Sequence, residues 1–195
     1  MKKLPLMLML AAMPFASQAQ YRSEVWCPDN GDGTYTNPII NADYSDPDIC
    51  VGASGEDFYM TASSFQCAPG LPILHSKDLV NWQIIGHALR EQKPYEVFNQ
   101  PTHGMGVWAP SIRYHDGEYY IYWGDPDYGV YMVKTKNPAG RWDDPVLVIP
   151  GKGMIDTCPL WDEDGRCYLA YAYAGSRAGV KSVLSVIEMT PDGTK

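Results

Sequence analysis

The feature that most constrains this sequence is a β-rich unit that recurs three times in register. Each unit opens on a short segment, two of them with an early proline, then passes a turn that contains glycine and enters a strand of aromatic and β-branched residues. The opening segments are 46–49, 109–112 and 156–160, and the strands that follow are 58–60, 119–122 and 167–169. Units of about forty to sixty residues built this way are typical of β-propeller blades. A β-sandwich explains the short strands but not the repeated opening.

A third strand is expected in each unit, at 75–82, 130–142 and 183–189. No stretch keeps a helical period, so the sequence predicts an all-β chain with about three blades. The domain is expected at 37–195, after a lead-in at 20–36. Propellers typically need four to eight blades to close. Because the sequence stops within a turn at Asp192-Gly193, we expect a truncated product whose remaining blades lie elsewhere.

The first nineteen residues have the pattern of a signal peptide. Lys2 and Lys3 precede an apolar run at 4–15, and small residues at 17 and 19 predict cleavage after Ala19. The apolar run is too short to span a bilayer. We therefore expect a secreted or periplasmic protein with no membrane insertion after cleavage.

Composition limits the partners and the redox chemistry. The net charge of −8 argues against nucleic acid as a partner, because phosphate binding needs a basic face. Five cysteines remain in an oxidising compartment, so at least one has no partner within the chain. Cys50 with Cys67, and Cys158 with Cys167, are possible bridges; buried thiols are the alternative. No cysteine or histidine spacing indicates a metal site.

Two carboxylates occupy matching places in the repeat. Asp46 opens the first unit and Asp156 the third, while Ala109 and Pro110, with Trp108 just before them, stand at the matching place in the second. The innermost strands of a propeller line one channel, so both carboxylates are expected at one end of it. A carboxylate pair beside an aromatic wall suits cleavage of a glycosidic bond.

Three ordered motifs resemble glycoside hydrolase family 43. They are Asn-Pro-Ile-Ile at 37–40 leading to Ser-Asp-Pro-Asp-Ile at 45–49, Trp-Ala-Pro-Ser-Ile at 108–112 followed by Gly117-x-Tyr-Tyr, and Ile-Asp-x-x-Pro-Leu at 155–160. The resemblance implies a five-bladed propeller that hydrolyses arabinose- and xylose-containing plant polysaccharides or oligosaccharides with inversion. It implies no required cofactor, and the sequence leaves a structural calcium ion open.

The same resemblance implies roles for single residues. Asp46 matches the general base that activates water, and Asp156 matches the carboxylate that raises the pKa of the general acid and orients it. The family's acid is a glutamate in a Glu-Gly-Pro segment, which this sequence lacks. Glu188 is expected on an outer strand facing solvent, so it is a poor substitute.

The remaining candidates are for substrate binding. Trp108 can stack on a sugar, and Arg177 and His103 lie in loops from which they can reach sugar hydroxyls. Asp125 and Asp127 flank Pro126 and are explained by turn chemistry.

Two function hypotheses follow. The first is an inverting arabinofuranosidase or β-xylosidase that is inactive or weak in this form. The second is a non-catalytic carbohydrate-binding propeller fragment.

Overall fold

The computed structural model describes residues 23–66 and 68–195. The predicted signal peptide, the first residues of the lead-in and Cys67 lie outside the described residues. Within them the chain forms eleven strands and two four-residue helices, so the all-β prediction is confirmed.

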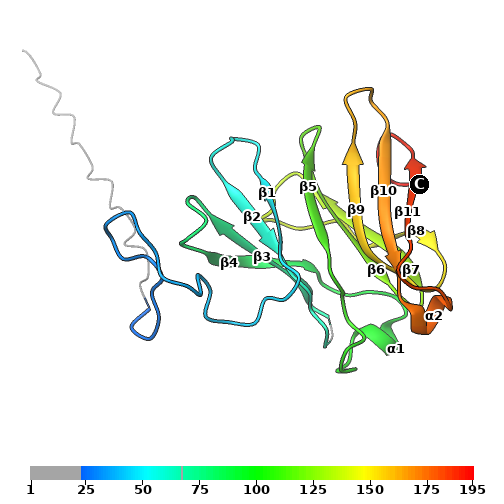
Figure 1. Cartoon of the computed structure of the whole chain (residues 1–195), viewed down its shortest axis with the longest axis horizontal. Helices are drawn as coiled ribbons and strands as arrows, with labels where there is room; N and C mark the ends of the chain where they lie inside the picture. Colours follow the sequence, from blue (N-terminus) through cyan, green and yellow to red (C-terminus); the bar gives the residue numbers. More distant parts are fainter. Residues whose placement is uncertain (1–22, 67) are drawn as a thin grey trace, which may run out of the picture.

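The strands form three antiparallel sheets, each made from consecutive strands (Figure 1). The first sheet contains β1 (Asp48–Val51), β2 (Phe58–Thr61), β3 (Gly70–Ser76) and β4 (Gln83–Leu89). The second contains β5 (Ser111–His115), β6 (Glu118–Asp125), β7 (Gly129–Thr135) and β8 (Val146–Pro150). The third contains β9 (Met154–Trp161), β10 (Cys167–Tyr173) and β11 (Leu184–Met189). The helices are α1 (Tyr95–Phe98) and α2 (Gly175–Ala178).

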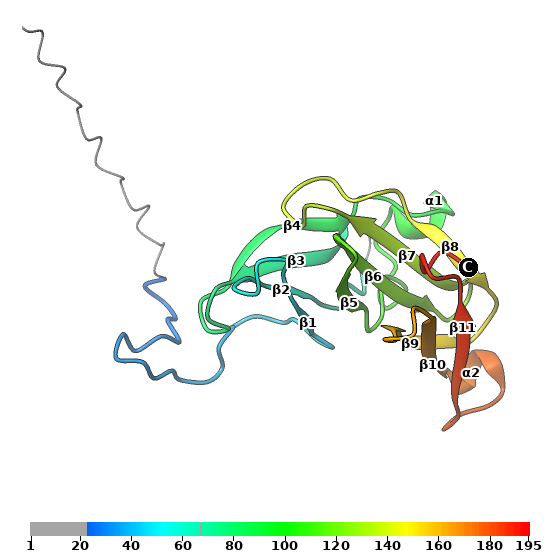
Figure 2. The same cartoon turned by 90° about the horizontal axis from the view of Figure 1, so that it is seen from above.

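The three sheets coincide with the three repeated units, and together they form no closed propeller. Sheets built from successive hairpins also differ from a sandwich, in which strands alternate between two facing sheets. The first strands of the sheets lie next to one another, since β1 contacts β5 and β5 contacts β9. Figure 2 shows the sheets fanning out from these three strands.

Strand β6 explains how the sheets hold together. Seven of its eight residues are buried, because the second sheet is covered on both faces. Ile121 and Trp123 belong to the core shared with the first sheet, whereas Tyr120 and Tyr122 belong to the core shared with the third. A strand buried on both sides needs an unbroken apolar run, and residues 119–123 supply it.

Two predicted strands end earlier than expected. In each, a side-chain hydroxyl accepts hydrogen bonds from backbone N–H groups that would otherwise have paired with the neighbouring strand. The strand predicted at 75–82 is wrong: β3 ends at Ser76, whose hydroxyl accepts hydrogen bonds from the backbone N–H groups of Asp78 and Leu79. Likewise β7 ends at Thr135, whose hydroxyl accepts the N–H of Asn137. The expected strand at 183–189 is confirmed as β11.

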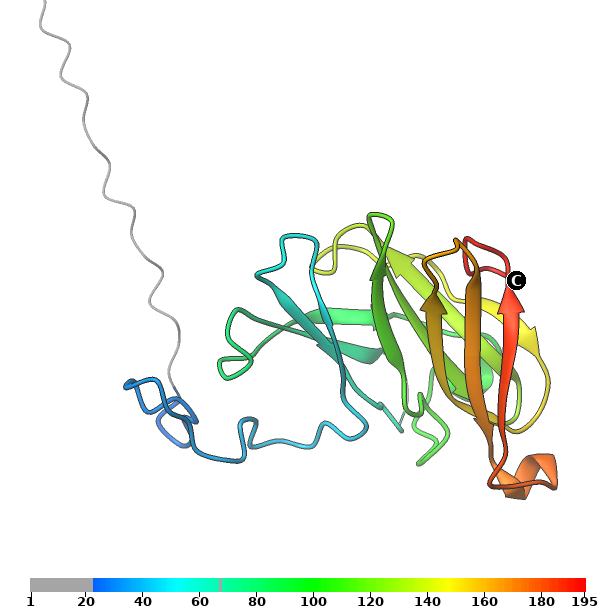
Figure 3. The ribbon, with the colours of Figure 1, turned by 45° about the horizontal axis from the view of Figure 1, so that its top comes forward.

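Residues 23–36 of the lead-in lie beside the first sheet and form no regular strand (Figure 3). Between residues 23–44 and the first sheet lies a cavity of about 510 Å³, whose lining includes Trp26, Tyr44, Leu74, Trp82 and Ile84. Its lining contains neither Asp46 nor Asp156, so this cavity is separate from the predicted carboxylate site.

The possible Cys158–Cys167 bridge is wrong. Both residues are free cysteines, and in the sheet Cys158 pairs with Ala170 while Cys167 pairs with Trp161. Cys50 and Cys167 are buried, in agreement with the alternative prediction of buried thiols. The possible partner of Cys50, Cys67, lies outside the described residues.

Candidate active site

Three backbone positions at the openings of the innermost strands share an unusual conformation. Asp46, Ala109 and Asp156 have φ values of 49°, 31° and 54°. This left-handed region is uncommon for residues other than glycine and is often found at functional sites. Asp46 and Ala109 each lie two residues before their strand begins, at β1 and β5. The repeat in the sequence therefore corresponds to a repeat in the backbone.

Asp156 differs in detail, because it lies inside β9 rather than before it. Ala170 pairs with Cys158 and Ala172 with Ile155, so Asp156 and Thr157 together face one residue of β10. This two-against-one pairing is a β-bulge, which turns a side chain away from the regular alternation.

The two carboxylates belong to one electrostatic environment. The pKa of Asp156 is raised, chiefly because neighbouring protein atoms remove water from its carboxyl and also because of the negative charge of Asp46. The residue is exposed as a whole, so this desolvation is partial. A carboxyl beside a second carboxylate holds its proton more readily.

Asp46 is held by a serine that the sequence did not point out. The Ser63 hydroxyl donates a hydrogen bond to Asp46 Oδ2 over 2.6 Å. Ser63 Oγ in turn accepts the N–H of Ala109 over 2.9 Å. Ser63 follows β2, so one side chain joins the openings of the first two innermost strands. A serine after a strand carries no signal that would have identified it.

Asp48, two residues after Asp46, binds the second sheet instead of Ser63. Asp48 Oδ2 accepts the N–H of Ile112 over 2.8 Å and forms an ion pair with Arg113. The other Arg113 terminal nitrogen lies 3.0 Å from Cys158 Sγ on β9. Arg113 on β5 thus connects the three innermost strands through Asp48 on β1 and Cys158 on β9.

Trp108 and Arg177 line the same small pocket, whose volume of about 10 Å³ suits a single water molecule. Its lining includes both residues with Phe98, Asp127 and Tyr128. The Trp108 indole N–H donates to the carbonyl of Gly104 over 2.9 Å, which fixes the ring. Arg177 lies in α2, not in an irregular loop, and its Nε donates to Asp127 Oδ1 over 3.3 Å. Asp127 therefore has a partner beyond the turn chemistry expected for it.

Asp125 is the buried carboxyl at this end of the sheets. Burial raises its pKa to about 6, and the backbone N–H groups of Asp127 and Tyr128, which donate to Asp125 Oδ1, oppose that rise. The two hydrogen bonds agree with the turn role expected for Asp125. The same turn is joined to β9 and α2, because Gly153 N–H donates to Pro126 and the Gly153 carbonyl accepts from Ala174.

Two candidates lie apart from this arrangement. His103 is exposed, and its Nδ1 is 2.8 Å from Gln66 Oε1; it lines neither cavity. Glu188 is exposed on β11, the outermost strand of the third sheet, as expected.

Neither a metal cluster nor a membrane helix is found in the part of the chain that the structure describes. Residues 23–66 and 68–195 contain no group of three His, Cys, Asp or Glu side chains arranged to hold a metal ion. Among the same residues no helix has the length and apolar character to cross a membrane.

Comparison with known families decides the relationship. The family model for glycosyl hydrolases family 43 matches residues 35–195. The chain belongs to this family. The three motifs and the ordered sheets are therefore those of a family 43 protein.

Individual relatives of this family 43 chain carry related names. It is 49% identical over 141 residues to the non-reducing end alpha-L-arabinofuranosidase BoGH43B of Bacteroides ovatus, covering 69% of this chain and 25% of that protein. It is 35% identical over 194 residues to a beta-xylosidase of Formosa agariphila, covering 94% of this chain and 32% of that protein. The chain thus spans about a quarter to a third of these relatives.

Solved structures agree with the fold. The Bacteroides ovatus xyloglucan PUL GH43B structure matches with a TM-score of 0.67 at 34% identity, over 81% of this chain and 30% of that one. A GH43_12 protein from a capybara gut metagenome also gives 0.67, at 30% identity over 80% of this chain and 30% of that one.

Proposed function

We propose that this chain contributes the first three blades of a five-bladed glycosidase that cleaves arabinosides or xylosides with inversion. The main support is that Asp46 and Asp156 both have a left-handed backbone conformation at matching places in the repeat and interact electrostatically. Names of the relatives, an arabinofuranosidase and a beta-xylosidase, support the substrate class. A signal peptide at 1–19 would direct the protein to the periplasm or outside the cell.

Each residue has a distinct task in this proposal. Asp46 takes a proton from water while the water oxygen bonds to the anomeric carbon; the leaving oxygen departs with the bonding electrons and receives a proton from the general acid. Asp156 acts through the general acid, raising its pKa and holding its orientation. Trp108 stacks on the sugar, and Arg177, held by Asp127, binds its hydroxyls.

The general acid is a glutamate outside this sequence. Without it, ordinary aryl arabinofuranosides and xylosides should show no measurable hydrolysis by the 195-residue chain, because acid–base assistance contributes roughly a hundred- to ten-thousandfold. A glycosyl fluoride needs no protonation of its leaving group, so base-activated water alone can displace fluoride.

The experiment is hydrolysis of α-L-arabinofuranosyl and β-D-xylopyranosyl fluoride, with the product anomer followed by NMR. We expect the wild-type chain to release fluoride with inversion and Asp46→Asn to release none. Asp156→Asn should keep most of the wild-type rate, because the chain has no general acid whose pKa Asp156 could raise. A retained anomer, or equal losses in both variants, contradicts the assigned roles. Hydrolysis of the aryl glycosides that disappears in Asp46→Asn contradicts the inactivity of the chain.

The second candidate is a carbohydrate-binding fragment without turnover, in which the Trp108 ring and the Arg177 guanidinium, which line the same small pocket, contact a sugar at its mouth. It predicts that xylose or arabinose oligosaccharides shift the Trp108 indole signal in NMR while neither fluoride is hydrolysed.

A further inference from the structure

We propose that Ser63 is a positioning residue that holds the Asp46 carboxylate in the orientation needed to activate the attacking water. This inference rests on the proposed function of Asp46, but its structural part can be tested without activity. The sequence and the family resemblance gave Ser63 no role.

The hydrogen-bond directions follow from the partners. The Ala109 N–H has a proton and no lone pair, so it must donate to Ser63 Oγ. The single hydroxyl proton of Ser63 then remains for Asp46 Oδ2 at 2.6 Å. Hydrogen bonds from a hydroxyl to a carboxylate are typically short, so this contact restrains the carboxylate closely.

The backbone around Ser63 fixes this geometry. Its own N–H donates to the carbonyl of Ser45, directly before Asp46, over 3.0 Å. On the next residue, Ser64 and Val107 exchange two backbone hydrogen bonds of 3.0 and 2.8 Å. That approach requires glycine at 106, where an added Cβ would lie 2.0 Å from the Ser64 carbonyl oxygen. Ser63 is therefore anchored on both sides of the contact it makes.

The arrangement also selects the orientation of Asp46 among its rotamers. With Oδ2 bound to Ser63, Oδ1 is left to face water or substrate. Asp46 has a left-handed backbone and an exposed side chain, and among the described residues Ser63 is the hydrogen-bond donor to its carboxylate. Ser63 binds none of the reacting atoms in this proposal; it acts through Asp46.

The first test is an NMR titration of the 195-residue chain. The amide proton of Ala109 should sense ionisation of Asp46 through the Ser63 hydroxyl, so its chemical shift should move as the pH falls through the acidic range. The movement should vanish in Ser63→Ala and in Asp46→Asn, remain in Ser63→Thr, and persist in Asp156→Asn and in the neighbouring control Ser45→Ala. If the Ala109 amide titrates unchanged in Ser63→Ala, the proposal is overturned.

The second test uses the glycosyl fluorides. Ser63→Ala should lower kcat by roughly 10- to 100-fold, the worth of one hydrogen bond to a charged group, with KM unchanged within about twofold. Ser63→Thr should restore the rate, and Ser45→Ala should leave it unchanged. An undiminished kcat in Ser63→Ala contradicts the inference while leaving the proposed function intact. A wild-type chain that releases no fluoride contradicts the proposed function, and the Ala109 titration still decides the placement of Ser63.

Discussion

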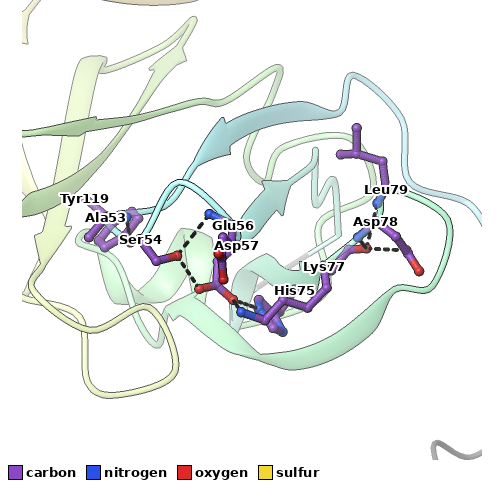
Figure 4. A network of polar contacts seen from close by, with 10 residues as sticks. Ala53, Ser54, Glu56, Asp57, His75, Lys77, Asp78, Leu79 and Tyr119 are labelled. Atoms are coloured by element: carbon purple, nitrogen blue, oxygen red, sulfur yellow. Dashed lines mark hydrogen bonds and ion pairs between the residues drawn. The ribbon is translucent and has the colours of Figure 1, made fainter.

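Asp57 lies at the centre of a polar cluster outside the proposed site (Figure 4). Its carboxylate lies 2.7 Å from Lys77 Nζ and 2.6 Å from His75 Nε2, and it accepts a 2.7 Å hydrogen bond from the Ser54 hydroxyl. These contacts hold the pKa of Asp57 well below its usual range, with Lys77 the largest cause, then Ser54, then His75. The cluster joins the β1–β2 turn to the end of β3.

We expect Asp57→Asn to lower the free energy of unfolding by about 1 kcal/mol at pH 7, the size of a partly exposed, hydrogen-bonded ion pair. Because the folded-state pKa is depressed, this stabilisation is present above the unfolded-state pKa of about 3.9 and is lost as the pH falls through the folded value. Urea unfolding at pH 7, 5 and 3 measures it. Asp144→Asn is the control, since that side chain is 86% exposed and lies 3.5 Å from Arg141. A loss of equal size at all three pH values would show that the charge is not the cause.

Thiol reactivity is a second property of single residues. Burial raises the pKa of Cys50 to about 12 and that of Cys167 to about 11, whereas Cys158 is exposed. Since the thiolate is the reacting form, iodoacetamide should label Cys158 in the folded chain and spare the other two. Peptide mass spectrometry reads the sites, and labelling in urea supplies the control in which all three react. Equal labelling of Cys158 and Cys167 without urea contradicts the structure.

At the scale of strands and turns, the sequence predicted what depends on local pattern. The aromatic run at 119–123 and the glycine turns indicated β6 and its neighbours correctly, because burial on both faces leaves a mark in the sequence. Strand ends were missed where hydroxyls such as those of Ser76 and Thr135 bind the following backbone. Ser63 was missed because its role depends on Ala109, 46 residues away, and no local pattern encodes such a contact.

Strands β6 and β9 approach each other closely at Gly124, which predicts that a larger residue there destabilises the fold. A Cβ on this β6 residue would lie 2.5 Å from the Met154 carbonyl oxygen and 2.7 Å from Ile155 Cα on β9. We expect Gly124→Ala to lower the free energy of unfolding by about 1–3 kcal/mol, because backbone must move. Gly86→Ala on β4 is the matched control, with nothing within 4 Å of the added carbon. Thermal unfolding of both variants measures the difference, and equal stabilities would refute the contact.

Gly124→Ala also bears on the proposed site, since Met154 and Ile155 directly precede Asp156. A displaced β9 should change the amide NMR signals of residues 154–157 in this variant more than in Gly86→Ala. The glycine at 124 therefore allows the second and third sheets to pack closely, and this packing helps to position Asp156.

At the scale of the whole molecule, the three sheets lie in a row, and the outer face of the third sheet is not covered by another sheet. Leu160 pairs with Tyr168, which pairs with Glu188, so these side chains share the face of the third sheet that points away from the second. Residues two apart on a strand lie on the same face, which adds Val186 and Leu184. Leu160, Leu184 and Val186 are 59%, 68% and 62% exposed. An apolar sheet face of this kind favours association.

We expect the 195-residue chain to associate through this face as its concentration rises, because contact removes apolar surface from water. Replacing Leu184 and Val186 together with threonine keeps the strand propensity of β11 but removes much of the apolar surface, so association should weaken while the circular dichroism spectrum stays unchanged. Val146→Thr on β8, an exposed residue of the second sheet, is the control and should associate like the wild type. Light scattering during size-exclusion chromatography measures the mass. A wild-type chain that stays monomeric and unfolds cooperatively would show that the third sheet is stable with this face in water.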